Sequence, residues 1–436
     1  MAVSSFLGTT IEYYDFLLYG TAAALIFNKV FFADLTPVVG TIVALATLAA
    51  GYLARLAGAL VFGHFGDRLG RKSVMLTTMV VMGTSSGLIG LLPTYAHIGA
   101  AAPLLLVFLR LCQGIAVGGE FGGAVLMTTE HARDGRRGRA TVSAVAGAPA
   151  GSLLATGVML LVTLLPEKDL LSWGWRLPFL ASFVLLAVGL WFRARISESP
   201  VFTAHHSTRP AAGQRPLTAM LRRSRRRFLL AVLVQLGPYF GNGVFALFVV
   251  SYAASIGYTR SAALDGLIIG LICSIAMTPV YAGVSDRVGR RPFIIAGCAA
   301  LALLAYPLFL MINTGSVLLL VLAVAVYVAF VLTPVTAVAP VLLSELFPTE
   351  VRYTATSTSY QLAQTVGSGF GPLIAASLIA AAGGGTNVGL LVVFLIVFAL
   401  VSTVAACLLP ETRTTTLIEA MPAIKPDGTP KAVTRL

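Results

Sequence analysis

The sequence has few charged residues, because Asp, Glu, Lys and Arg make up only 11% of its 436 residues, against about 25% in an average soluble domain. Together with a hydrophobic content of 57%, this shortage excludes a water-soluble globular enzyme. A helix that spans a bilayer needs roughly 20 apolar residues, so about a dozen spans with short loops would use the whole length. The sequence therefore predicts an all-α integral membrane protein with no separate soluble domain.

Cysteine and histidine are also scarce. The four cysteines lie in apolar runs at unrelated spacings and the five histidines are scattered, which matches neither a disulfide framework nor a zinc site. We therefore expect no metal and no cofactor. The chain also lacks an ATP-binding loop of the form G-x-x-x-x-G-K-[ST], so we expect no enzyme activity and a proton gradient as the energy source. The first apolar run has no basic segment before it and contains Glu12 and Asp15, which favours a retained first span over a signal peptide.

Twelve apolar runs alternate with charged or Gly/Pro-rich breaks. They lie near residues 4–27, 38–62, 73–92, 103–129, 140–165, 176–192, 228–256, 263–284, 293–312, 317–343, 354–382 and 388–409. Every second gap, together with the tail after residue 409, holds 24 of the 30 Lys and Arg residues. The positive-inside rule then places these gaps and both termini in the cytoplasm. The net charge of +13 is thus explained by topology, and we expect no nucleic-acid partner.

The chain repeats itself at an offset of about half its length. Three pairs of landmarks recur: Asp67 with Asp286 at an offset of 219, Arg139 with Arg352 at 213, and Glu198 with Glu411 at 213. Parallel repeats of this kind place a substrate site between the halves near the membrane midplane. We expect a six-helix bundle at 1–192, a cytoplasmic linker at 193–227, a second six-helix bundle at 228–409 and a cytoplasmic tail at 410–436.

The first landmark belongs to the loop GHFGDRLGRK, which returns in the second half as AGVSDRVGRR. Gly66 and Gly70 permit a tight turn, and the charged residues around them can form charge pairs that hold the protein closed on its cytoplasmic side. A merely basic loop is the alternative. From both copies of the loop and the segments before spans five and eleven we predict gating by Asp67, Arg68, Arg71, Lys72, Arg139, Asp286, Arg287, Glu345 and Arg352.

With this loop the sequence resembles the major facilitator superfamily over essentially its whole length. The segments EYYDFLLYG, RLCQGIAVGGEFGGA, SWGWRLPFL, ESPVF and SELFPTEVRYTATSTSYQL are similar to its metabolite:proton symporter branch, which transports shikimate, α-ketoglutarate, citrate and proline/betaine, and most of all to shikimate-like members. The resemblance implies twelve helices in two pseudo-symmetric bundles. Two positions depart from the pattern: Phe121 stands where the branch usually has Trp, and Ala282 replaces the first Gly of the second loop.

Five ionisable residues interrupt the apolar spans, all in the first half: Glu12, Asp15, Arg55, Arg110 and Glu120. A charge near the bilayer centre costs several kcal/mol, so such residues usually face a cavity or each other. A carboxylate beside an arginine can be ionised while paired and protonated when the arginine turns to an anionic substrate. For proton coupling we predict Asp15 first, then Glu12, then Glu120. A purely structural pair between helices is the alternative, and Arg55 is either functional or a packing residue.

Polar residues at helical spacing identify candidate substrate ligands in both halves. Arg110 and Gln113 are spaced i, i+3, and in the second half neutral aromatic and amide groups take the place of charges. Such groups orient a small polar substrate by hydrogen bonds, or else bond between helices. The predicted substrate-binding residues are Arg110, Gln113, Tyr19, Gln235, Tyr239, Asn242, Tyr360 and Gln364.

These features together predict a monomeric transporter of the bacterial inner membrane, which takes up a small organic acid with protons by alternating access. An osmolyte symporter for a zwitterion is the main alternative, because three acids against two arginines in the spans do not exclude it. A drug/proton exporter is less favoured, because the intramembrane charges and the family-like segments match the uptake branch.

Overall fold

The computed structural model describes residues 2–32, 34, 37–133, 135–195, 224–349 and 351–415, and all regular structure in these ranges is helical. Ten helices of this part of the chain are long and apolar enough to cross a membrane. The other two expected spans, near 4–27 and 38–62, coincide with helices as well. Most of the expected linker and tail lies outside the described residues.

The first half forms the following elements: α1 (Ala2–Ala22), η1 (Ala23–Phe27), α2 (Asn28–Val30), α3 (Pro37–Leu69), α4 (Arg71–Leu91), α5 (Tyr95–Ile98), α6 (Ala101–Glu130), α7 (Arg137–Thr163), α8 (Glu167–Asp169), η2 (Leu170–Gly174) and α9 (Arg176–Ala194). The η elements are single π-helical turns, so α1, η1 and α2 form one continuous span. The last long helix runs past the expected end at residue 192 and thereby places Arg193, which the sequence assigns to the linker, inside the bundle.

The second half repeats this pattern with α12 (Arg225–Asn242), η3 (Gly243–Phe248), α13 (Val249–Ser255), α14 (Arg260–Val288), α15 (Arg291–Ile312), α16 (Val317–Val326), η4 (Tyr327–Leu332), α17 (Thr333–Leu346), α18 (Arg352–Gln364), η5 (Thr365–Gly369), α19 (Gly371–Ala381) and α20 (Gly389–Leu408). Three of its spans are interrupted by a π-helical turn, a feature that is frequent at functional sites.

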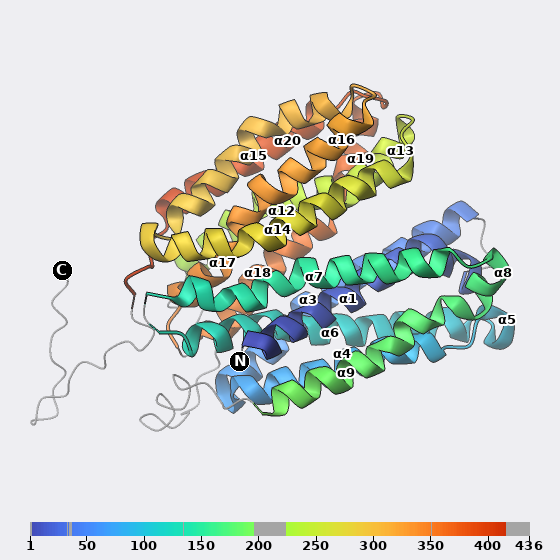
Figure 1. The fold of residues 1–436 in the computed structure, drawn as a ribbon, viewed down its shortest axis with the longest axis horizontal. Coiled ribbons are helices and arrows are strands. Elements are labelled where there is room, and N and C mark those ends of the chain that lie inside the picture. The colour runs from blue at the N-terminus through green and yellow to red at the C-terminus, as the bar shows by residue number, and fades with distance from the viewer. Residues whose placement is uncertain are drawn as a thin grey trace, which may run out of the picture.

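The helices form two bundles that lie against each other at one end and diverge toward the other (Figure 1). Helices α3, α6 and α7 of the first bundle contact α14, α17 and α18 of the second. We call the converging end the motif end, because both copies of the loop motif lie there. Each copy turns at one glycine with positive φ, Gly70 at 105° and Gly289 at 118°, a conformation that favours glycine.

The structure corrects the role expected for Gly66. This residue lies inside α3 and makes no turn. A Cβ atom on Gly66 would collide with Cδ2 of the Tyr353 ring on α18, so the glycine permits close approach of the two bundles. Gly63 one turn earlier is similar, because its Cβ would lie 2.8 Å from the Cα atom of Thr354.

Candidate functional site

Four of the five ionisable residues expected in the spans remain without a charged contact partner at the centre of the molecule. We call them the central cluster: Glu12 and Asp15 on α1, Arg55 on α3 and Arg110 on α6. All four are at most 1% exposed. None of them takes part in an ion pair within the described part of the chain. Because unpaired buried charge is costly, these groups are strong candidates for function.

Arg110 is held by the residues that the sequence places beside it. Its Nη1 atom donates to Oε1 of Gln113 at 2.5 Å, and Nε2 of Gln113 donates to Oγ of Ser86 at 2.6 Å. Its Cζ atom lies 4.1 Å from the ring centroid of Tyr19 and 4.3 Å from that of Phe16. Ring faces attract a guanidinium, so the predicted ligands Tyr19, Gln113 and Arg110 do come together.

Arg55, whose role the sequence leaves open, reaches the second bundle. Its Nη1 atom donates to Oε1 of Gln364 on α18 at 3.1 Å. Its Cζ atom lies 3.7 Å from the ring centroid of Phe16 and 5.2 Å from that of Tyr52. Arg55 therefore joins the central cluster to a predicted substrate ligand of the opposite bundle.

The three carboxylates have different surroundings. Oδ1 of Asp15 accepts a hydrogen bond from Oγ of Ser182 at 2.5 Å, while its Oδ2 and Oε2 of Glu12 have no partner atom among the described residues. Glu120 instead forms an ion pair with Arg193 and accepts from Thr78 at 2.8 Å. Sequence reasoning missed Arg193 because the sixth span appeared to end before it. With Arg193 included, the spans hold three acids and three arginines rather than three acids and two arginines.

An aromatic group from both bundles borders the central cluster. The hydroxyl groups of Tyr13 and Tyr360 lie 2.8 Å apart. The ring of Tyr360 stacks on Phe121 with a centroid distance of 3.9 Å and meets Tyr239 edge to face at 5.7 Å. Phe121, which departs from the family pattern, thus contacts a predicted substrate ligand directly.

The other predicted ligands of the second half bond within their own bundle. Nε2 of Gln235 donates to the carbonyl of Ala231 at 2.6 Å, and Nδ2 of Asn242 donates to Oγ of Ser368 at 3.0 Å. Gln361 is different, because its amide is fully buried and neither its nitrogen nor its oxygen has a partner in the described part of the chain. Gln235 has one such unpaired atom, its amide oxygen, so Gln361 is the better candidate ligand.

At the motif end the carboxylate of Asp67 binds the first turn of a helix in the other bundle. Oδ1 accepts from the backbone N–H of Tyr353 at 3.1 Å, and Oδ2 accepts from the backbone N–H of Thr354 at 2.9 Å and from its hydroxyl at 2.8 Å. The free N–H groups and the dipole at a helix N-terminus favour a carboxylate. Asp67 therefore caps α18 across the interface between the bundles.

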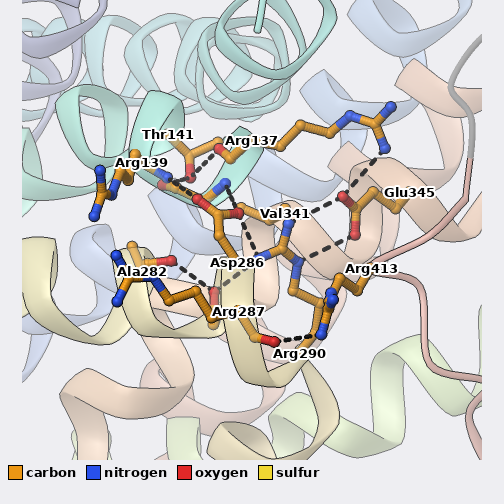
Figure 2. Close-up of polar contacts among 12 residues, drawn as sticks. Arg137, Arg139, Thr141, Ala282, Asp286, Arg287, Arg290, Val341, Glu345 and Arg413 are labelled. Carbon is orange, nitrogen blue, oxygen red and sulfur yellow. Dashed lines mark hydrogen bonds and ion pairs between the residues drawn. The ribbon is translucent and has the colours of Figure 1, made fainter. Parts of the chain in front are cut away.

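Asp286 makes the reverse contact (Figure 2). Its Oδ1 accepts from the backbone N–H of Gly138 at 2.8 Å and its Oδ2 from that of Arg139 at 3.0 Å, in the first turn of α7. Arg139 thus contributes its backbone to this contact. We call these two interactions, made by Asp67 and Asp286, the two clasps.

Each clasp is surrounded by a buried set of charges. Around Asp286, Arg290 pairs with Asp286 at 2.8 Å and with Glu345 at 3.2 Å, and Arg137 approaches Glu345 at 3.4 Å (Figure 2). Around Asp67, the corresponding residues are Arg71, Glu130 and Arg352: Arg71 lies 3.6 Å from both Asp67 and Glu130, and Arg352 lies 3.1 Å from Glu130.

This comparison corrects the repeat register. Arg137 and Arg352 are each the first residue of their helix and each pairs with a buried glutamate. The counterpart of Arg352 is therefore Arg137, at an offset of 215, and not Arg139. The sequence prediction missed Arg137, Glu130 and Arg290. A signal was available, since Glu130 and Glu345 also differ by 215.

Three predicted gating residues lie at the edge of this network. Arg68 and Arg287 are exposed, and the backbone carbonyl of Arg287 accepts a hydrogen bond from Arg413 (Figure 2). Lys72 donates to the carbonyl of Ala194 at 3.0 Å within the first bundle. Their gating roles remain predictions.

The segment after α20 crosses the motif end. Both oxygens of Glu411 accept from the backbone N–H of Arg290, at 2.9 and 3.1 Å. Burial raises the pKa of the Glu411 carboxyl, but backbone N–H groups outweigh it and hold the pKa below its ordinary value. Thr412 donates to Glu345 at 2.7 Å, and Arg137 donates to the carbonyl of Thr415 at 2.5 Å. This segment therefore touches both bundles.

Comparison with known proteins agrees with this architecture. The family model described as Major Facilitator Superfamily matches residues 5–358 and 271–421. The shikimate transporter of Escherichia coli K12 is 36% identical over 94% of each chain, and the inner membrane metabolite transport protein YhjE of the same organism is 37% identical over 94% of each. The proline/betaine transporter of E. coli K12 is 32% identical over 96% of this chain and 84% of its own.

Among solved structures, the proton:xylose symporter XylE bound to 6-bromo-6-deoxy-D-glucose superposes with a TM-score of 0.79 at 20% identity, over 96% of this chain and 97% of the other. At this identity the similarity concerns the fold. The matches confirm the predicted two-bundle fold, and the relatives are transport proteins rather than enzymes.

Proposed function

Since this chain belongs to the major facilitator superfamily, we propose that it takes up a small organic acid together with protons across the bacterial inner membrane. In this proposal the motif end and both termini face the cytoplasm. The relatives named as shikimate and metabolite transport proteins support the substrate class.

The observation that carries the proposal is the central cluster, with its two acids and two arginines that are buried but not paired. Arg110 binds the substrate carboxylate, because a guanidinium donates two parallel N–H groups to a carboxylate. Asp15 carries the proton. With Glu120 and Arg193 neutralising each other, the cluster has no net charge when both acids are ionised, so one monoanion and one proton enter without a net buried charge.

The two clasps support alternating access as the mechanism. Both close the motif end, and their carboxylates bind backbone groups of the opposite bundle. The structure therefore corresponds to a state closed toward the proposed cytoplasmic side. Opening to that side requires both aspartates to leave their helix N-termini.

An osmolyte symporter is the second candidate, and the charge balance is equally compatible with it. Three acids against three arginines suit a zwitterion as well as an acid with a proton. The relative named as a proline/betaine transporter points the same way. Against it, the ring of Phe16, a surface that could bind a quaternary ammonium group, already faces two guanidinium groups.

Uptake into proteoliposomes with an imposed pH gradient tests the proposal. We expect an organic acid from a panel of shikimate, α-ketoglutarate, citrate and aromatic acids to accumulate only when the outside is more acidic. Proline and betaine form the comparison group. Accumulation of betaine or proline but of no acid would establish the second candidate, and uptake of acids without dependence on the gradient would refute proton coupling.

A further inference from the structure

Arg55 and Arg110 leave the same part of their guanidinium groups unpaired. Each uses its Nη1 atom to donate to a glutamine, Gln364 and Gln113 respectively. In each the Nε and Nη2 atoms are buried and have no hydrogen-bond partner in the described part of the chain. The two side chains are 1% and 0% exposed. Two equivalent pairs of donors in the central cluster therefore remain unsatisfied by the described residues.

This unpaired edge has a defined ligand chemistry. The Nε–H and Nη2–H groups of an arginine are parallel and match two oxygen atoms held side by side. A buried donor without an acceptor costs about 1–3 kcal/mol, and more when it is charged. Each edge is therefore suited to one acceptor group that offers two oxygens.

Both edges lie within reach of one small molecule. The Cζ atoms of Arg55 and Arg110 lie 3.7 and 4.3 Å from the centroid of the same Phe16 ring. The sum of these distances, 8.0 Å, is an upper limit on the separation of the two Cζ atoms. A substrate that neutralises both groups would also relieve the repulsion between two like charges this close.

Gly51 of α3 packs beside the edge of Arg110. A Cβ atom on Gly51 would lie 2.5 Å from Nε of Arg110 and 3.2 Å from its Nη2. A side chain at this position would therefore displace these two donors. This position thus provides a second, independent way to block the same edge.

We infer that the substrate is a bifunctional organic acid, whose carboxylate binds Arg110 and whose second pair of oxygens, on a carboxylate or a vicinal diol, binds Arg55. This inference rests on the proposed function and refines its substrate class. Arg55 is then the residue that selects for the second group. Arg55 also donates a hydrogen bond to Gln364 of the second bundle. Substrate bound to the free edge of Arg55 is therefore connected to the second bundle through this residue.

Binding is tested on the purified protein in detergent, as ligand-dependent thermal stabilisation, so that the result does not depend on transport. The ligands are a dicarboxylate (α-ketoglutarate), a dihydroxy acid (shikimate) and a simple monocarboxylate of similar size (cyclohexanecarboxylate). We expect the parent to bind at least one bifunctional acid about tenfold more tightly than the monocarboxylate. Which bifunctional acid binds identifies the second group.

Two variants separate the two arginines. Arg55→Gln should weaken binding of the bifunctional acid about tenfold and change binding of the monocarboxylate less than twofold. Retained binding of the monocarboxylate also shows that the variant is folded. Arg55→Lys should behave similarly, because an ammonium lacks the parallel pair of donors. Gly51→Ala should weaken binding of all three acids alike, since the added Cβ atom would collide with the edge of Arg110.

The inference is overturned if the parent binds the monocarboxylate as tightly as both bifunctional acids, or if Arg55→Gln weakens all three equally. Failure of the proposed function has a different signature: the acids bind with this selectivity, but none is accumulated by proteoliposomes under a pH gradient.

Discussion

Asp67 and Asp286 are related by reciprocal capping: each lies near the end of a long helix in its own half and accepts hydrogen bonds from the first-turn amides of a helix in the other half. The interface at the motif end is therefore held by two equivalent contacts of opposite direction. Both contacts break when the bundles separate at the motif end. Both are therefore markers of the state in which this end is closed.

Replacing either clasp carboxylate should favour opening of the motif end. Asn removes the charge and one of the two acceptor oxygens, and a helix cap of this kind is worth about 1 kcal/mol. We expect Asp67→Asn and Asp286→Asn each to raise the ratio of open to closed molecules about fivefold. Labelling of a cysteine introduced at the motif end measures this ratio. Asp265→Asn, at an exposed position of α14, is the control, and unchanged labelling in both clasp variants would contradict the assignment.

Gly138 gives a steric test of the same interface. A Cβ atom there would collide with the backbone carbonyl of Ala282 in the other bundle. We expect Gly138→Val to hold the motif end open and to slow transport more than tenfold, with substrate binding retained. Gly157→Val is the matched control, because a Cβ on Gly157 of the same helix has nothing within 4 Å. Equal transport rates in the two variants would show that closure does not need this contact.

Asp15→Asn should separate substrate binding from proton coupling. Asn has nearly the shape of Asp and keeps the oxygen that accepts from Ser182, but it cannot titrate. Exchange of substrate across the membrane needs no net proton movement and should survive, while accumulation driven by a pH gradient should vanish. If the variant still concentrates substrate, the proton carrier is Glu12 or Glu120, and Glu12→Gln is the next variant to measure.

The Glu120–Arg193 pair should behave as a structural unit. Removing one member of a buried pair leaves an uncompensated charge, at a cost of about 3–5 kcal/mol. We expect Glu120→Gln and Arg193→Gln each to lower the melting temperature in detergent strongly, and the double variant to lower it by clearly less than the sum. Additive effects of the two substitutions would show that the pair is not coupled.

Glu411 should make the stability of the motif end depend on acid pH. Its folded-state pKa lies below the ordinary value of 4.5, so its stabilising effect is present above that value and is lost as the pH falls through the folded-state pKa. We expect the melting temperature of the parent to decrease more between pH 6 and about pH 3 than that of Glu411→Gln. Parallel pH profiles for the two proteins would contradict this assignment.

Hydropathy, the distribution of basic residues and the repeated loop were enough to predict the spans and the fold, because each span is long and each loop motif recurs. The position of Arg193 was not predictable in this way, since an arginine at the end of an apolar run is equally typical of a loop. The equivalence of Arg137 and Arg352 depends on where each helix begins, which spacing alone leaves uncertain by a few residues.

Contacts between the bundles were beyond the reach of sequence periodicity. The bond from Arg55 to Gln364 joins residues 309 positions apart, and only the relative placement of the bundles reveals it. Periodicity did predict that Arg110 and Gln113 lie side by side, because these residues are one turn apart on the same helix. It could not show that Gln235 bonds to its own helix.

Apart from the Thr354 hydroxyl, the clasp carboxylates bind backbone groups of the partner helix, and this has a consequence for mutational tolerance. Asp286 accepts from the backbone amide of Arg139, so the residue type at this position can change without loss of the donor. Proline alone removes the N–H group. A saturation scan should therefore find Asp67 and Asp286 nearly invariant, while position 139, where the arginine is exposed, should exclude proline far more strongly than any other residue type. The hydrogen-bond donors of this gate are mainly backbone N–H groups, so a comparison of residue types between sequences does not reveal them.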